Sequence, residues 1–371
     1  MNTPDAQLCL ALHNIPHLGD TLLARLFLHY GCAQTIWHSN PAHWVGLGAR
    51  PEAIHAAGKA LKNDTLRLQA QQQCERLAHL NAQVLALTDD HYPPLLRTIY
   101  DPPPLLYVRG NARLLSEAQL AVVGSRKASP AGRRAARTLS AGAVRAGLHI
   151  SSGLALGIDG EAHRAALDSG GATIAVMATG IDTVYPARHR ALAEDIASNG
   201  VLVTEFAPGC GPDRFRFPRR NRILSGLSLG VLVVEAALRS GSSITAGAAL
   251  EQGREVFAVP WSMFHEGGKG CLRLLREGAK MVEQLSDIVD ELGPLYSLQS
   301  ELHSTNQLVS ALTEAATPDQ RCIDVMVGYE AVTVDELVRQ SSLPVARVTA
   351  ALASLELIQR VSRCSGGYIH S

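Results

Sequence analysis

The sequence predicts an α/β fold: a doubly wound, mostly parallel sheet with a helical domain before it and a winged-helix domain after it. Between Gln119 and about Ile288, short apolar runs rich in Val and Ile alternate with longer segments of helical character, which is typical of this class. The apolar runs are continuous, so both faces of each strand should be covered by helices. A polar, irregular stretch then separates this region from a short C-terminal block.

Six strands are expected in the central region, which we place at residues 111–292. Each strand is a short run bounded by turn residues. Right-handed crossovers should bring every strand-to-helix loop to one edge of the parallel sheet, and the residues with unusual chemistry fall in these loops. The expected strands are 119–124, 148–152, 173–178, 200–204, 231–235 and 255–259.

Residues 1–110 form a block that is helical with short interruptions and ends in the proline-rich segment Asp101–Pro104. Within it, Ile15–Asp20 resembles a helix-hairpin-helix or SAM-like unit, although His17 replaces the first of the two glycines of a typical hairpin. A role in packing or partner binding is therefore favoured over direct DNA contact. His13 and His17 are one helical turn apart but have no third ligand nearby, so we interpret them as surface or capping residues rather than a metal site.

Residues 293–317 are polar and lack periodicity, which indicates a linker. The remaining residues, 318–371, have a winged-helix outline in which 346–355 would occupy the recognition-helix position. Only Arg347 is basic on that helix, so a protein-interaction or DNA-backbone role is favoured over sequence readout. Three helices and two strands are expected here, at 319–327, 334–340 and 345–355 and at 358–361 and 366–369.

The composition is that of a folded protein without long disorder. Of the 371 residues, 46% are hydrophobic, and 34 Lys and Arg balance 34 Asp and Glu. The balance is uneven along the chain, because residues 119–222 contain 14 Lys and Arg against 8 Asp and Glu, an excess of six. The seven cysteines are scattered without zinc or disulfide spacing, and no segment reads as a signal peptide or membrane span. We therefore expect a cytoplasmic protein with no membrane partner.

The most unusual segment is Asp213–Arg222, which has five arginines and two phenylalanines in ten residues. Guanidinium groups bind phosphate oxygens as two-point donors, and exposed rings offer faces on which unpaired bases stack. An isolated basic run more often pairs with nearby carboxylates. Here two glycine turns, Gly124–Lys127 and Ser240–Thr245, also follow apolar strands, and all three loops should meet at the carboxyl edge of the sheet. The pattern favours an anion site suited to single-stranded nucleic acid.

Several kinds of catalytic or nucleotide site are not indicated. The chain has no Walker phosphate loop, no Gly-x-Ser-x-Gly elbow and no Gly-x-Gly-x-x-Gly after the first strand, where an arginine replaces a glycine. Asp159, Glu161 and His163 could form an acid–base or metal cluster, but a helix cap by Asp159 is favoured. Glu205 and Glu235 end two strands and are interpreted as holding the arginines of the central loop in place. We therefore expect no enzymatic activity, no cofactor and no metal.

From Tyr92 to Ala279, the sequence resembles the DprA/Smf family of DNA-processing proteins. The shared motifs are weak individually and highly specific together. They are Tyr92-Pro93, Pro104–Tyr107, Gly124-Ser125-Arg126, Ser152–Ala155, Gly157-Ile158-Asp159, Gly180-Ile181-Asp182, Tyr185-Pro186, Phe217–Arg222, Ser240-Gly241-Ser242 and Glu251–Arg254. Two positions depart from the family pattern, Trp261 where glycine is usual and Leu272 where asparagine is usual. The loop at 260–272 is therefore left out of the expected site.

This resemblance implies an extended Rossmann-like domain that binds single-stranded DNA without sequence preference and protects it. It also implies a homodimer that helps to load the RecA recombinase during DNA uptake and natural transformation. By motif, Gly124–Arg126 would form a phosphate pocket, and Arg214 and Phe217 would provide charge and stacking. A basic wall would be completed by Arg219, Asn221 and Arg222. The full expected DNA-binding set is Gly124, Ser125, Arg126, Lys127, Ser152, Gly153, Arg214, Phe217, Arg219, Arg220, Asn221, Arg222, Ser240, Gly241, Ser242 and Thr245.

Two other functions stay open at the level of the sequence. Nucleotide phosphoribohydrolases of the lysine-decarboxylase-like group share this kind of sheet and bind phosphates at a glycine-rich turn. Their Pro-Gly-Gly-x-Gly-Thr hallmark is absent here, and Gly241–Thr245 is the nearest analogue. A double-stranded DNA transcription factor would depend on the winged helix, whose shortage of basic residues counts against it.

Overall fold

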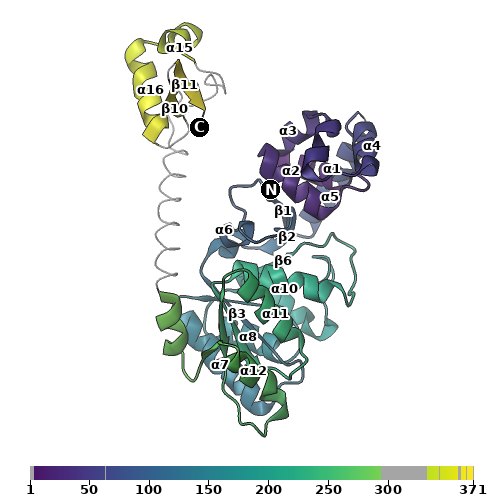
Figure 1. Cartoon of the computed structure of the whole chain (residues 1–371), viewed down its shortest axis with the longest axis vertical. Helices are drawn as coiled ribbons and strands as arrows, with labels where there is room; N and C mark the ends of the chain where they lie inside the picture. Colours follow the sequence, from purple (N-terminus) through teal and green to yellow (C-terminus); the bar gives the residue numbers. More distant parts are fainter. Residues whose placement is uncertain are drawn as a thin grey trace. The chain divides into compact units, whose positions relative to one another are not determined.

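The computed structural model describes residues 4–62, 64–293, 332–341, 343–357, 361–364 and 366–370. The chain divides into two compact units, residues 1–296 and 297–371, each with its own core. The first unit contains a large β-sheet with helices around it, and the second unit has a helix pair and a β-hairpin (Figure 1). The predicted fold class is therefore confirmed.

Nine strands form one sheet within the described residues, in the spatial order β1-β2-β6-β5-β4-β3-β7-β8-β9. Neighbours from β6 to β9 run parallel, whereas β2 is antiparallel to both β1 and β6. All six predicted strands are present, with ends that differ by one or two residues at most. The strands are β1 Ala82–Ala86, β2 Leu105–Gly110, β3 Gln119–Gly124, β4 His149–Ser152, β5 Thr173–Val176, β6 Val201–Thr204, β7 Gly230–Glu235, β8 Glu255–Ala258 and β9 Lys280–Met281.

Helices cover both faces of the sheet, as the continuous apolar strands predict. Successive residues of β3 alternate between two cores: Leu120 and Val122 face α7 and α8, and Ala121 and Val123 face α10 and α11. The strand-to-helix loops consequently gather at the carboxyl edge of the parallel strands. The helices of this region are α7 Pro130–Arg145, α8 Ile158–Asp168, α9 Arg190–Asn199, α10 Arg216–Leu227, α11 Gly241–Glu251 and α12 Lys269–Arg276.

The N-terminal region differs from the expected helical block of residues 1–110. Its long helices end at His79. The chain then forms β1 and β2, which join the sheet, with the short helix α6 (Pro94–Arg97) between them. The prediction missed these strands because periodicity alone does not distinguish a five- or six-residue apolar strand from a buried helical segment. The helices are α1 Pro4–His13, α2 Asp20–Tyr30, α3 Ala33–His38, α4 Pro51–Ala60 and α5 Thr65–His79, with a 3₁₀ helix η1 at Pro41–Leu47.

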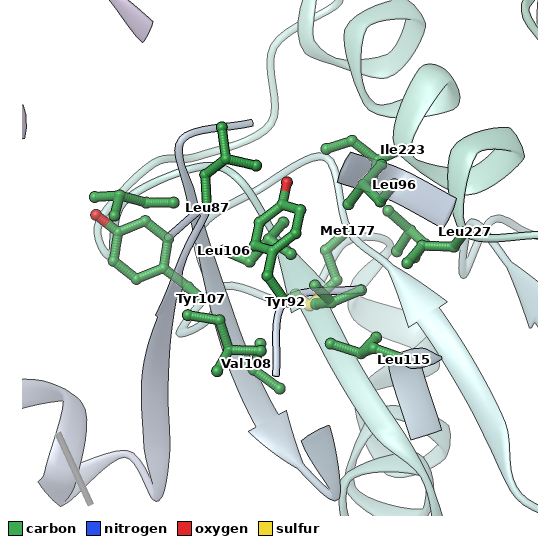
Figure 2. Close-up of a cluster of buried hydrophobic side chains, with 14 of the residues drawn as sticks. Leu87, Tyr92, Leu96, Leu106, Tyr107, Val108, Leu115, Met177, Ile223 and Leu227 are labelled. Carbon is green, nitrogen blue, oxygen red and sulfur yellow. The ribbon is translucent and has the colours of Figure 1, made fainter. Parts of the chain in front are cut away.

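A buried cluster joins α10 to the antiparallel extension of the sheet, which consists of β1, β2 and the segment between them (Figure 2). Tyr92 and Leu96, from the segment between β1 and β2, belong to the same cluster as Ile223 and Leu227 of α10. The Tyr92 hydroxyl donates to the Pro103 carbonyl at 2.8 Å, so the polar atom of this buried side chain is satisfied. The extension and the parallel sheet therefore share one core.

The loop at residues 14–19 joins α1 to α2 where the hairpin is predicted. His17 has a φ of 65°, the left-handed conformation that favours glycine. His13 Nε2 lies 2.9 Å from Asp20 Oδ1, and Asp20 also pairs with Arg219 of α10. Burial acts to raise the pKa of Asp20, but His13 and Arg219 outweigh it and lower the pKa to about 2. His13 therefore supports a carboxylate that contacts the parallel-sheet region.

The second unit contains α15 (Val334–Ser341), α16 (Val345–Leu357) and a hairpin of β10 (Val361–Cys364) and β11 (Gly367–His370). Leu337, Val348, Leu352 and Val361 form its core. These elements fit the predicted winged helix, and residues 358–360, where the first strand is predicted to begin, lie outside the described residues. The predicted helix at 319–327 and the linker beyond Gly293 lie outside the described residues.

A buried arginine fixes α10 against the ends of the central strands. Arg220 is 5% exposed, and its guanidinium donates to the Gly153 carbonyl at 2.7 Å and to the Val176 carbonyl. These carbonyls lie just after β4 and at the end of β5. A Cβ on Gly153 would come within 2.4 Å of the guanidinium, so a larger residue at this position would displace Arg220 from these carbonyls.

Asp159 provides a negative charge near Arg220. Its Oδ2 accepts from the backbone N–H groups of Gly153 at 3.1 Å and Ala155 at 3.3 Å. Burial raises the pKa of the Asp159 carboxyl, and the Arg220 charge opposes that rise. Burial likewise lowers the pKa of Arg220 to about 10, against the effect of Asp159, so this guanidinium is protonated at neutral pH. Each charge therefore offsets part of the desolvation cost of the other.

Replacement of Arg220 by Met should lower the free energy of unfolding by about 3–5 kcal/mol, because it leaves the buried Asp159 and two carbonyls without their partner. Urea denaturation measures the change. Arg214→Met is the matched control, because Arg214 is exposed in the loop before α10 and its loss should change stability by no more than about 0.5 kcal/mol. Equal effects of the two substitutions would contradict the role assigned to Arg220.

His163 of α8 is buried and neutral. Thr173 Oγ1 donates its proton to the Ile150 carbonyl at 2.6 Å. In its 2.7 Å hydrogen bond with His163 it therefore accepts, and His163 Nδ1–H is the donor. His163 Nε2 is buried and has no protein hydrogen-bond partner, so a proton there would be left unsatisfied. Burial, reinforced by the charges of His189 and Arg220, lowers the pKa of His163 to about 3.

This histidine should make the protein less stable in acid. The unfolded chain protonates His163 near pH 6.5 and the folded chain only near pH 3, so the unfolded state binds more protons between these values. The contribution is complete above pH 6.5 and should fall by about 1.4 kcal/mol per pH unit below it. Urea denaturation at a series of pH values tests this: His163→Gln should flatten the pH dependence, and an unchanged slope would contradict the assignment.

Candidate nucleic-acid interface

The carboxyl edge of the sheet contains a pocket of about 270 Å³. Its wall is formed mainly by the loop after β3, the start of α10 and the loop that leads into α11. Ten of the sixteen expected DNA-binding residues line it, so the three loops do share one crevice, as predicted. These ten are Gly124, Ser125, Arg126, Phe217, Arg220, Asn221, Ser240, Gly241, Ser242 and Thr245.

The loop after β3 is held in place by backbone hydrogen bonds. The Ser125 N–H donates to the Glu235 carbonyl at 2.7 Å, and the Ser125 carbonyl accepts from the Ile158 N–H at 3.2 Å. Arg126 and Lys127 follow, both exposed, and neither forms an ion pair within the part of the chain that the structure describes. The fixed loop therefore presents two uncompensated cations at the pocket and beside it.

An aromatic and cationic rim forms one side of the pocket. Arg126 lies over the ring of Phe217, with its guanidinium carbon 5.1 Å from the ring centre. Tyr185 meets the same ring edge-on, with 5.8 Å between the centres, and is 45% exposed. The sequence places Tyr185 in a family motif but does not assign it to the site, because its contact with Phe217 joins two loops that are distant in sequence.

The start of α11 adds a partial positive charge to the pocket. Ser240 precedes the helix, its side chain makes no capping hydrogen bond, and Gly241 is the first helical residue. The first N–H groups of a helix have no partner within the helix and carry the positive end of its dipole. Because both residues line the pocket, phosphate oxygens would find backbone donors there.

Arg219 and Arg222 have a different position from the basic wall that the sequence suggested. Both bind the buried carboxylate of Glu205, at 3.1 and 2.5 Å. Arg219 also pairs with Asp20 of α2, and Arg222 with Asp101 at 3.1 Å. The prediction that Glu205 holds arginines of this loop is thus confirmed, and their charges are compensated away from the pocket.

The pKa values of Glu205 and Arg219 are both raised, and each group acts on the pKa of the other. Burial raises the pKa of the Glu205 carboxyl, and the charges of Arg222 and Arg219 oppose that rise. Burial acts to lower the pKa of Arg219, but Glu205 and Asp20 outweigh it and raise the pKa. The ion pairs therefore stabilise the charged forms of groups that contact both α10 and α2.

Two further expected residues lie behind the pocket wall, and Asn221 of the wall joins two helices. Ser152 is fully buried and its hydroxyl donates to the Val122 carbonyl at 2.6 Å, and Gly153 accepts from Arg220. The structure thus places these two behind the wall rather than on it. Asn221 Nδ2 lies 3.5 Å from the Gly241 carbonyl and joins α10 to the start of α11.

Arg214 lies outside the pocket wall. It is exposed, and its guanidinium carbon is 4.6 Å from the centre of the Phe215 ring, which is 70% exposed. Among the described residues, no carboxylate forms an ion pair with it. Arg214 and Phe215 therefore repeat, just before α10, the pairing of a cation with a ring that Arg126 and Phe217 form at the pocket.

Glu235 does not hold an arginine, contrary to the sequence-based interpretation. Its carboxylate accepts from the Ser129 N–H at 3.0 Å and from the Ser129 hydroxyl at 2.7 Å. Ser129 caps α7 by accepting from the Gly132 N–H, so Glu235 supports the start of that helix. The difference arises because the residue at this strand end faces the loop after β3 rather than α10.

Asp159, Glu161 and His163 do not form an acid–base or metal cluster. Glu161 pairs with Arg137 at 2.5 Å, and His163 bonds Thr173. Asp159 does accept backbone N–H groups, but those of the loop before α8 instead of the first turn that the cap prediction implied. Within the described residues, no group of three or more His, Cys, Asp and Glu is placed to hold a metal ion.

The helices of the described part of the chain differ from membrane spans in length and hydropathy. None of them is both long enough and apolar enough to cross a bilayer.

Two family models match the chain. The model described as DNA recombination-mediator protein A matches residues 83–293, and the model of the DprA winged helix domain matches residues 310–367. Together they cover the sheet with its pocket and most of the C-terminal block.

Individual relatives agree with these matches. Protein Smf of Synechocystis sp. is 34% identical over an alignment of 386 positions, gaps included, which covers 96% of each chain. Protein Smf of Escherichia coli is 41% identical over 297 residues, 78% of this chain and 77% of that protein. The structure of DNA processing protein A from Streptococcus pneumoniae has a TM-score of 0.67 and 35% identity, and covers 78% of this chain and 99% of that one.

A second solved relative is DNA processing protein A from Helicobacter pylori, for which a unique single-stranded DNA binding mode is described. It has a TM-score of 0.52 and 29% identity, and covers 58% of this chain and 97% of that one. With the matched sheet region, the winged helix and a relative aligned over nearly the whole length, the chain belongs to the DprA/Smf family, whose central domain is that of DNA recombination-mediator protein A.

Proposed function

We propose that this protein binds single-stranded DNA at the carboxyl edge of its sheet, without sequence preference, and protects it. The observation that carries the proposal is the contact between Arg126 and Phe217 at the pocket, next to the start of α11. A cation and helix N–H groups suit a phosphate, and the adjacent ring suits an unpaired base. The single-stranded DNA binding mode described for the Helicobacter pylori relative supports this reading.

The same features explain a preference for single strands and an indifference to sequence. A base inside a duplex is stacked on its neighbours, so its face is not available to Phe217 or Tyr185. Every base has a face that can stack, and phosphate contacts carry no sequence information. The site offers a charged rim and aromatic rings in place of a row of side chains aimed at base edges.

We also propose that the protein acts by binding rather than catalysis, as a mediator that loads RecA onto the strand during DNA uptake, and that it works as a homodimer. The family description as a recombination mediator supports the recombinase partner. A dimer would present two such sites to one strand, which raises the effective affinity without a new contact. The alternative, a phosphoribohydrolase, would need a carboxylate free to act in the pocket. The Asp159 carboxylate is engaged by two N–H groups.

Phe217→Ala should weaken binding of an oligo-dT strand by about 5- to 150-fold, because one stacked base is worth about 1–3 kcal/mol. Fluorescence anisotropy of a labelled strand, with its duplex in parallel, measures the affinity. The wild type should prefer the single strand, and the substitution should reduce that preference. A wild type that binds neither strand would overturn the proposed function.

Arg126→Ala should reduce the steepness of the salt dependence, because each neutralised phosphate contributes about −0.7 to the log–log slope for a single strand. The measurement is the anisotropy titration repeated over a salt series. Arg113→Ala is the matched control: Arg113 is an exposed arginine in η2 (Ala112–Ser116), near the amino end of β3 rather than its carboxyl end. Equal slopes for the two variants would count against a phosphate contact by Arg126, whereas release of free base from a nucleoside monophosphate would count against a protein that acts by binding alone.

A further inference from the structure

The phenylalanines that lie outside the core gather at one edge of the sheet. The chain has six phenylalanines, all within the described residues. Three are buried, and the other three are Phe215, Phe217 and Phe264. Phe215 lies just before α10 and Phe217 in its first turn, both after β6, and Phe264 lies between β8 and α12. Because β6 and β8 belong to the same parallel series, both loops lie at the carboxyl edge.

Phe264 is held at an exposed position by a structured loop. Trp261 Nε1 donates to the Val234 carbonyl at 2.8 Å, and the Trp261 ring packs on His265, with 4.4 Å between the centres. The Ser262 carbonyl accepts from the His265 N–H at 2.9 Å. Phe264, inside this turn, is 85% exposed. Trp261, which departs from the family pattern, therefore anchors the loop in a conformation that leaves the Phe264 ring in solvent.

Glu235 connects this loop to the one that carries Arg126. The Glu235 carboxylate accepts from Ser129, at the end of the loop after β3, and lies 3.7 Å from His265 Nε2. A Cβ on Gly267 would come within 2.8 Å of the same carboxylate. The loop after β3 and the loop after β8 therefore both pack against the Glu235 side chain at the end of β7, which holds them next to each other.

Exposed cations lie in the loops between the two aromatic positions. The order of the sheet places β7 between β3 and β8, and neighbouring strands are about 5 Å apart, so the ends of β3 and β8 are separated by roughly 10 Å. Lys127 follows β3 and Arg239 follows β7, and both are exposed. Neither makes an ion pair with a carboxylate in the described ranges. A polyanion that left the pocket in this direction would meet positive charge.

We propose that Phe264 is a second stacking platform for single-stranded nucleic acid, so that the strand continues from the pocket, past the end of β7, to the loop after β8. A base would stack on Phe264, and Lys127 and Arg239 would compensate the intervening phosphates. This inference rests on the proposed function and extends it by a binding position that lies outside the pocket. The exposed cations in the loops between the two aromatic positions, which continue from the pocket, favour nucleic acid over a protein as the partner.

Strand length separates this second position from the first. Oligo-dT of about 4 nucleotides should fill the pocket alone, whereas about 15 nucleotides should reach both positions, within the range of site sizes known for single-strand binders. Phe264→Ala should weaken binding of the long strand by about 5- to 150-fold, as expected for one stacked base. It should change binding of the short strand by less than about twofold. Anisotropy titrations of the full chain at one salt concentration measure both.

Three variants make the test specific. Phe264→Tyr keeps a ring and should bind the long strand like the wild type, and Phe264→Leu keeps an apolar side chain without a ring and should behave like Phe264→Ala. Met263→Ala removes a neighbouring exposed apolar side chain, 69% exposed, and should have no effect. Because Phe264 is almost fully exposed, the thermal unfolding midpoint should not change in any of them.

The outcomes distinguish this inference from the proposed function. If the wild type binds single strands and Phe217→Ala weakens both lengths, while Phe264→Ala leaves both unchanged, the second platform is overturned and the pocket stands. Equal losses on both lengths after Phe264→Ala also overturn it, because the ring would then act on the pocket itself. Wild-type binding of the long strand by Phe264→Leu, or a comparable loss after Met263→Ala, would overturn it too, because the loop would then contribute apolar surface rather than a stacking ring. No binding by the wild type would remove the proposed function as well.

Discussion

The buried guanidinium of Arg220 is the group on which the position of α10 depends, and the pocket depends on α10. It bonds carbonyls at the ends of two central strands and offsets the charge of Asp159. The same helix carries Phe217 one turn earlier and Asn221 next to it. An arginine taken out of water is expensive unless charge and hydrogen bonds surround it. This helix therefore has one position in which its charged group is satisfied, and that position sets the aromatic rim.

The run of five arginines before and within α10 is not one functional surface. Arg214 is exposed beside Phe215, Arg220 is buried, and Arg219 and Arg222 bind Glu205. The uncompensated charge at the pocket instead comes from the loop after β3 and from the start of α11. A dense basic sequence can thus serve mainly to attach a helix, while a sparser loop supplies the cation that a ligand would meet.

The parallel part of the fold could be predicted because its strands are continuous apolar runs and its loops obey one handedness rule. The sharing of a pocket by Gly124, Phe217 and Gly241 follows from that rule. The antiparallel strands β1 and β2 could not be predicted as readily, since such short runs do not show a period. The partners of Glu205 and Glu235 could not be predicted either, because they depend on the direction in which each side chain points at the end of its strand. Tyr185 and Phe264 owe their positions to contacts between distant loops.

The attachment of β1 and β2 has a practical meaning for any attempt to isolate the sheet region. A chain begun at residue 111, where the sequence suggested a boundary, would lose the partner of β6, which pairs with β2 from Tyr107 to Gly110. The unpaired N–H and C=O groups of β6 would then form a bare edge, a template for pairing with another molecule and hence for aggregation. Cleavage after His79, between α5 and β1, would leave that edge covered.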